Sequence, residues 1–64
     1  MTRIPRGGYL FISWSSDHPP RHVHVWREGT LVLKWDLELY RPIRGSAGKK
    51  LAALIRELET EGLL

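Results

Sequence analysis

The sequence predicts an α+β fold in which a three-stranded antiparallel sheet carries one C-terminal helix packed on one face (β-β-β-α). Two observations predict this fold. Three stretches within residues 9–37 are rich in β-branched and aromatic residues or alternate apolar and polar side chains, as strands do. One stretch near the C-terminus repeats its apolar residues at helical spacing. We expect all 64 residues to form a single small domain.

The strands are expected at about residues 9–14, 22–27 and 30–37. A three-residue loop at 27–29 is favoured between the second and third, because Gly29 supplies the left-handed residue that such loops end with. The predicted buried face then consists of Leu10, Ile12, Trp14, Val23, Val25, Leu31, Leu33 and Trp35. The predicted opposite face consists of Tyr9, Phe11, Ser13, His22, His24, Trp26, Val32 and Lys34. The alternative, a two-residue turn at 28–29, would pair Trp26 with Leu31 and place both histidines on the Leu/Trp face.

The helix is expected at about residues 47–61, with Ser46 as its N-cap and Gly62 as its terminator. Its apolar stripe consists of Leu51, Leu54, Ile55 and Leu58. One helix covers only one face of a sheet. The face that carries the histidines must therefore meet solvent, a ligand or another subunit.

Composition limits the kinds of protein this chain can be. There is no cysteine, which excludes disulfides and thiolate zinc sites. No apolar run approaches the roughly 20 residues of a membrane span, so we expect a cytoplasmic protein with no membrane partner. The net charge is +3, and basic residues concentrate in residues 1–27 and 41–50. These zones either meet as a patch for a polyanion or form ordinary solvated surface.

The densest group of polar residues is the run 17–25, Asp-His-Pro-Pro-Arg-His-Val-His-Val, which holds all three histidines. Its prolines predict a rigid loop, and His22 and His24 should then point to the same side of a strand. The run resembles the Asp-His-x-Pro-Pro-His-x-His-Val signature of a bacterial family, the domain of unknown function numbered 4160. The matching residues are Asp17, His18, Pro20, His22, His24 and Val25. Arg21 stands where many members have the second proline.

The resemblance covers nearly the whole chain and implies a strand, the signature, a hairpin and a C-terminal helix. The family has no established activity. Its members look like small bacterial accessory proteins suspected of belonging to toxin–antitoxin-type modules. The resemblance therefore implies a fold and a grouping more than a function.

Three chemical uses of the histidines are open. With His18 or Asp17, the pair His22 and His24 would supply three metal ligands and an open position. Alternatively, two imidazoles about 7 Å apart would act as acid and base on RNA, with Arg21 holding the phosphate. The third use is structural: the imidazole N–H groups would satisfy carbonyls of the loop.

Binding without chemistry is the favoured interpretation. Tyr9, Phe11, His24 and Trp26 would form a stacking platform for RNA or DNA. The same apolar surface would otherwise serve a cognate protein or a homodimer. The predicted binding residues are Asp17, His18, Arg21, His22, His24, Trp26, Arg27, Lys34, Lys49 and Lys50. No cofactor is expected, and the alternatives are a histidine-dependent ribonuclease or metal-dependent hydrolase (candidates His18, His22 and His24) and a homodimeric interaction domain.

Overall fold

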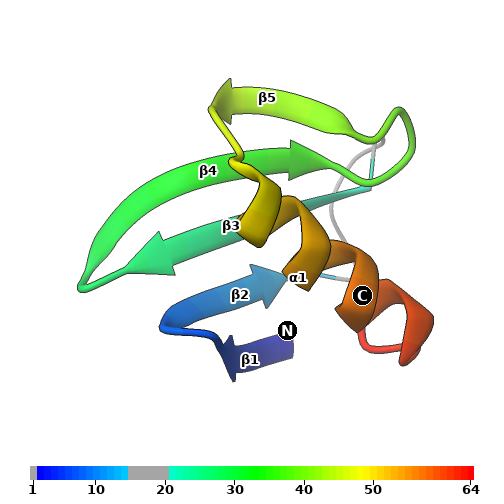
Figure 1. Cartoon of the computed structure of the whole chain (residues 1–64), viewed down its shortest axis with the longest axis horizontal. Helices are drawn as coiled ribbons and strands as arrows, with labels where there is room; N and C mark the ends of the chain where they lie inside the picture. Colours follow the sequence, from blue (N-terminus) through cyan, green and yellow to red (C-terminus); the bar gives the residue numbers. More distant parts are fainter. Residues whose placement is uncertain (1, 15–20) are drawn as a thin grey trace.

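The computed structural model describes residues 2–14 and 21–64. Within these residues, five antiparallel strands form one sheet and a helix lies across one of its faces (Figure 1). The elements are β1 (Thr2–Arg6), β2 (Tyr9–Ser13), β3 (His22–Arg27), β4 (Thr30–Asp36), β5 (Arg41–Gly45) and α1 (Lys49–Thr60). The strands are neighbours in chain order, β1-β2-β3-β4-β5. The predicted α+β class is broadly right, but the predicted three-stranded sheet is wrong.

The two strands that the sequence did not reveal, β1 and β5, are the edges of the sheet. Each contains a proline: Pro5 lies opposite Leu10, and Pro42 lies opposite Trp35. Proline cannot donate a hydrogen bond to the ladder, so within sheets it is tolerated mainly on edge strands. The same prolines lower the strand propensity of both segments, and this is why the pattern of the sequence hid them.

The turn between β3 and β4 has two residues, so the predicted three-residue loop is wrong. Glu28 and Gly29 both have positive φ, 51° and 76°, as a two-residue hairpin turn of type I′ requires. Arg27 and Thr30 pair directly on either side of it. The left-handed position was correctly assigned to Gly29, but the turn also forces Glu28 into that conformation.

A β-bulge then restores the predicted core face for Val23, Val25, Leu33 and Trp35. The prediction is wrong at the bulge itself, where Leu31 pairs with Trp26 and Val32 packs against the core. Trp26 pairs with Leu31, whereas the preceding Val25 pairs with Leu33, so β4 contains one extra residue at this point. Beyond the bulge, Val23 pairs with Trp35. The bulge therefore reconciles a two-residue turn with histidines that point away from the Leu/Trp face.

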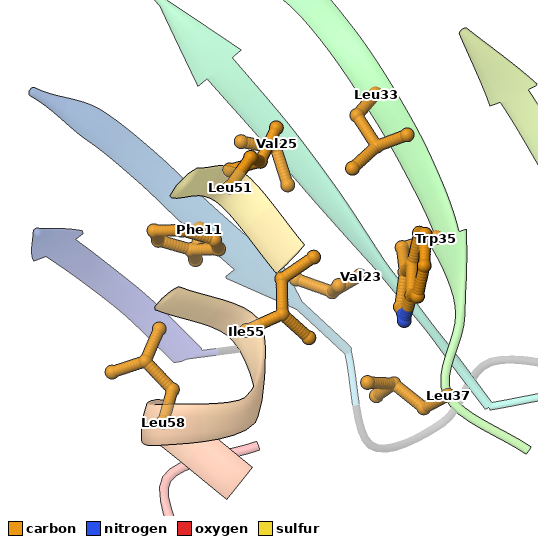
Figure 2. Packing of buried hydrophobic residues seen from close by; sticks show 9 residues of the cluster. All are labelled: Phe11, Val23, Val25, Leu33, Trp35, Leu37, Leu51, Ile55 and Leu58. Carbon is orange, nitrogen blue, oxygen red and sulfur yellow. The ribbon is translucent and has the colours of Figure 1, made fainter. Parts of the chain in front are cut away.

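The hydrophobic core fills the space between the sheet and α1 (Figure 2). It consists of Phe11, Val23, Val25, Leu33, Trp35, Leu37, Leu51, Ile55 and Leu58. The prediction for β2 is inverted: Phe11 is fully buried and pairs with Val25, whereas Leu10 and Ile12 point to the other face. Four consecutive apolar residues begin β2, so alternation could not show which side is buried.

The helix is two residues shorter at its N-terminal end than predicted. Gly48, not Ser46, is the N-cap, and it makes no side-chain capping bond. At the other end, the Gly62 N–H donates to the Glu59 carbonyl and the Leu63 N–H to the Leu58 carbonyl. This pattern is a Schellman motif around a left-handed glycine, which confirms Gly62 as the terminator.

Candidate nucleic-acid interface

The face of the sheet that points away from α1 carries a row of five side chains, of which three are cationic, one is a histidine and one is an isoleucine. Each strand contributes one residue, and each of these residues pairs directly with the next across the sheet. From β1 to β5 they are Arg3, Ile12, His24, Lys34 and Arg44. Residues that pair directly in antiparallel strands project from the same face. We call these five residues the basic row, and the face that carries them the open face.

The burial pattern shows which side this face is on. Phe11 is the neighbour of Ile12 on β2, and Val25 is the neighbour of His24 on β3. Phe11 and Val25 are fully buried against the helix. Because successive side chains of a strand point to opposite faces, the basic row points away from α1. Among the described elements, α1 is the one that packs on the sheet, and it packs on the Phe11 side (Figure 2).

Positive charge predominates on the strands. The five strands contain six basic residues and one acidic residue, Asp36. Asp36 is 3% exposed, and its Oδ1 accepts hydrogen bonds from the N–H groups of Glu38 (2.8 Å) and Leu39 (3.0 Å). Its carboxylate is thus engaged in the turn between β4 and β5. Asp36 is thus the single carboxylate on the five strands, and it is buried and hydrogen-bonded rather than available to the three cations of the basic row.

Two other strand cations belong to the helix side of the molecule. Arg6 forms ion pairs with Glu57 (2.9 Å) and Glu61 of the helix end. The hydrogen bond from Arg6 holds the pKa of Glu61 below its usual range. The guanidinium of Arg27 lies 5.6 Å from the ring centre of Tyr9, which packs against the core. The structure thus separates Arg27, a predicted binding residue, from the basic row.

The histidines form an aromatic group at one end of the open face. The rings of His22 and His24 are 5.2 Å apart and in edge contact, and the Trp14 ring is 4.9 Å from that of His24. The two imidazoles are on one side of β3, as predicted. They are closer than the predicted 7 Å, and in edge contact they leave no space between them for a phosphodiester.

Other predicted binding residues lie elsewhere. Asp17 and His18 fall outside the described residues, and so does any metal set that includes His18. Among residues 2–14 and 21–64, no three His, Cys, Asp or Glu side chains are grouped closely enough to hold a metal ion. Lys49 and Lys50 are exposed in the first turn of α1, in the layer opposite the open face (Figure 1).

Arg21 is fixed by its backbone where β3 begins. Its N–H donates to a carboxylate oxygen of Glu38, and its carbonyl accepts from the N–H of Leu37 (2.8 Å). Its exposed side chain lines a pocket of about 330 Å³ together with Trp14 and His22. The strand ends therefore hold Arg21 beside the aromatic group.

A second, larger pocket opens at the opposite end of the strands, beside the two hairpin turns. Its volume is about 790 Å³, and it is lined by Pro5, Arg6, Gly7, Gly8, Tyr9, Leu10, Ile12, Trp26, Glu28 and Gly29. Pro5, Leu10 and Trp26 lie directly opposite one another in β1, β2 and β3. Each is two residues along its strand from a member of the basic row, and therefore on the same face. We call this depression the turn pocket.

Several residues of the open face escaped the sequence analysis. The predicted platform of Tyr9 and Phe11 is wrong, because Phe11 is buried and Tyr9 packs against the core. Arg3 and Arg44 were missed together with their strands. The Gly7-Gly8 dipeptide was the available signal for β1, because two glycines between short strand-like runs are typical of a hairpin turn.

Comparisons with protein-family models, curated proteins and solved structures return no match. Membership in the family numbered 4160 therefore stays a prediction. Of the residues described here, no helix is long and apolar enough to cross a membrane.

Proposed function

We propose that the protein binds single-stranded nucleic acid across the open face of its sheet. The observation that carries the proposal is the basic row, in which Arg3, Lys34 and Arg44 occupy three of the five positions of one line that crosses all five strands. His24 supplies an aromatic ring within that line, and the ring of Trp14 lies next to it. A basic track with aromatic rings on which bases stack is the usual means of binding single strands.

The dimensions of the row suit a short extended strand. Adjacent strands of a sheet are about 4.8 Å apart, so the four steps from β1 to β5 cover roughly 19 Å. A single strand that crosses the sheet can place phosphates near the cations and splay its bases onto the rings. A duplex conceals its base faces, so aromatic rings on a sheet favour unpaired bases.

Charge also distinguishes nucleic acid from a second copy of the chain. A two-fold dimer through the open face would bring the basic rows of both copies into one interface. Like charges placed across an interface oppose association. A polyanion is instead complementary to the row. The proposal contains no bond-breaking step, assigns the histidines to binding, and places the protein in the cytoplasm.

The test is fluorescence anisotropy with a labelled, mixed-sequence RNA of about 12 nucleotides, within the range of site sizes known for small single-strand-binding domains. The triple variant Arg3→Gln, Lys34→Gln, Arg44→Gln removes three charges from the row. Wild type should bind at low salt, and the variant should lose most of that binding. Denaturing electrophoresis of the same mixtures shows whether the RNA is cut.

The matched control removes the same net charge from the other layer. The triple variant Lys49→Gln, Lys50→Gln, Arg56→Gln changes three exposed cations of α1. It should retain wild-type affinity, although Lys49 and Lys50 are among the binding residues predicted from the sequence. Equal losses in both variants would contradict a defined interface. No binding by wild type would refute the proposal and leave the open face to a cognate protein.

A further inference from the structure

The pocket beside Arg21 lies where the ends of β1, β2 and β3 meet the C-terminal residues that follow α1. Five of the residues that line it come from these strand ends: Thr2, Ser13, Trp14, Arg21 and His22. His22 is two residues from His24 on β3 and therefore points to the open face. Thr2 is the neighbour of Arg3 on β1. The pocket thus adjoins the open face beside the β1 end of the basic row, and we call it the strand-end pocket.

The lining of the strand-end pocket combines apolar, aromatic and hydroxyl groups. Its apolar part consists of Leu37, Leu63 and Leu64. Trp14, which is 36% exposed, adds an indole ring on which a base can stack. Thr2 and Ser13, which pair directly across β1 and β2, add two hydroxyls that can donate hydrogen bonds. Ligand sites commonly combine apolar and aromatic walls with a few polar groups in this way.

Arg21 supplies the positive charge of the pocket. In the described part of the chain, the ion pairs are those of Arg6 with Glu57 and Glu61, so no carboxylate is paired with the Arg21 guanidinium. Glu38 contacts Arg21 through the backbone, where its carboxylate accepts from the Arg21 N–H. A guanidinium presents forked N–H donors that match the oxygens of a phosphate. An exposed arginine beside hydroxyls and an indole is therefore suited to a phosphate that carries a base.

We propose that the strand-end pocket binds the terminal phosphate of the single strand that crosses the basic row. Arg21 donates to the phosphate oxygens, the hydroxyls of Thr2 and Ser13 are the further donors, and the last base stacks on Trp14. This inference rests on the proposed function, since the terminal phosphate belongs to the strand that the basic row holds.

A terminal phosphate suits this pocket better than an internal one. A phosphate monoester carries a charge of about −1.5 to −2 at neutral pH and three free oxygens. A phosphodiester within the chain carries one charge and has two free oxygens. The pocket volume of about 330 Å³ is near the lower end of the range for ligand sites, about 300–1,000 Å³, so it suits one nucleotide unit. An internal nucleotide would also have to lead the chain out of the pocket again.

The experiment is fluorescence anisotropy with one RNA sequence of about 12 nucleotides, labelled on an internal base so that both ends are free. The RNA is made with hydroxyls at both ends, with a 5′ phosphate, or with a 3′ phosphate. A phosphorylated form should bind roughly tenfold tighter than the hydroxyl form, the lower end of what a hydrogen bond to a charged group contributes. The form that gains shows which end the pocket takes. Equal affinities for all three forms would overturn the inference.

Two single-charge variants separate the pocket from a general attraction to charge. Arg21→Gln should abolish the gain from the phosphate, because it removes the cation but keeps the backbone hydrogen bonds of this position. Arg56→Gln removes the same charge from α1 and should keep the whole gain. Trp14→Leu should reduce the gain, because it removes the ring on which the last base stacks. A gain that survives Arg21→Gln, or that falls equally in Arg56→Gln, would overturn the inference.

The inference and the proposed function fail separately. RNA that binds through the basic row with no preference for a phosphorylated end would contradict the strand-end pocket alone. RNA that binds only when it is phosphorylated, and whose binding is lost in Arg21→Gln but kept in the triple sheet variant, would contradict the basic row alone.

Discussion

Lys34 occupies the position of the basic row on β4, between His24 and Arg44, and its replacement gives a quantitative test. Each phosphate contact to a single strand contributes about −0.7 to the slope of log K against log salt. Three cations in the row predict a slope of about −2.1 for wild type and about −1.4 for Lys34→Gln. A fourfold rise in salt should therefore weaken wild type about 18-fold and the variant about 7-fold.

The assay is anisotropy of labelled RNA at several salt concentrations, at constant pH. Arg56→Gln is the matched single-charge control, because the Arg56 guanidinium lies on α1, 5.1 Å from the ring centre of Tyr40. The control should keep the wild-type slope. Identical slopes for wild type and Lys34→Gln would refute the assignment of Lys34 to a phosphate, even if the affinity fell.

Three further predictions concern the scaffold. Gly45→Ala should destabilise the fold by about 2–4 kcal/mol in urea denaturation, because its φ is positive and a Cβ would lie 2.5 Å from a β4 carbonyl oxygen. Gly8→Ala has nearly the same φ but open space, so it should cost only about 1–2 kcal/mol, and equal losses would contradict the clash. Asp36→Ala removes a buried acceptor from two backbone N–H groups and should cost about 2–4 kcal/mol, whereas a loss below about 1 kcal/mol would show that water replaces it. The pKa of Glu61 is lowered in the folded protein by the Arg6 hydrogen bond, so its stabilisation is present above the unfolded pKa near 4.5 and is lost as the pH falls. Glu61→Gln should thus be less stable than wild type at neutral pH but not in acid, and a difference independent of pH would contradict the ion pair.

The central part of the fold followed from side-chain alternation. On β3 and on the second half of β4 apolar and polar residues alternate, so the placement of Val23, Val25 and Leu33 in the core was predictable and is confirmed. The helical stripe was equally clear, and Leu51, Ile55 and Leu58 are buried as predicted. These elements contain the strongest periodicity in the chain.

The edges and β2 could not be predicted in the same way. Pro5 and Pro42 are compatible with a strand only at an edge, and being at an edge is a property of the whole sheet rather than of the segment. On β2 a run of apolar residues suits either face, and the choice of Phe11 for the core depends on its pairing with Val25. The bulge in β4 likewise has no signature in a single strand.

These errors explain what was found and missed at the candidate site. His24, Trp26 and Lys34 belong to the well-predicted strands, and their predicted placement away from the helix agrees with the structure. Arg3 and Arg44 complete the basic row only because β1 and β5 exist. The distribution of charge along the sequence therefore predicted the cations of the candidate site less well than their positions across the sheet show them.

The most direct test of the open face is an amide-resolved NMR titration of the protein with single-stranded RNA at low salt. The proposal predicts shifts of amide resonances along the basic row on β1 through β5, and these shifts should fade as salt is added. The amide resonances of the exposed residues of α1 should not shift. Shifts concentrated on α1 around Lys49 and Lys50, or no shifts at high RNA excess, would contradict it.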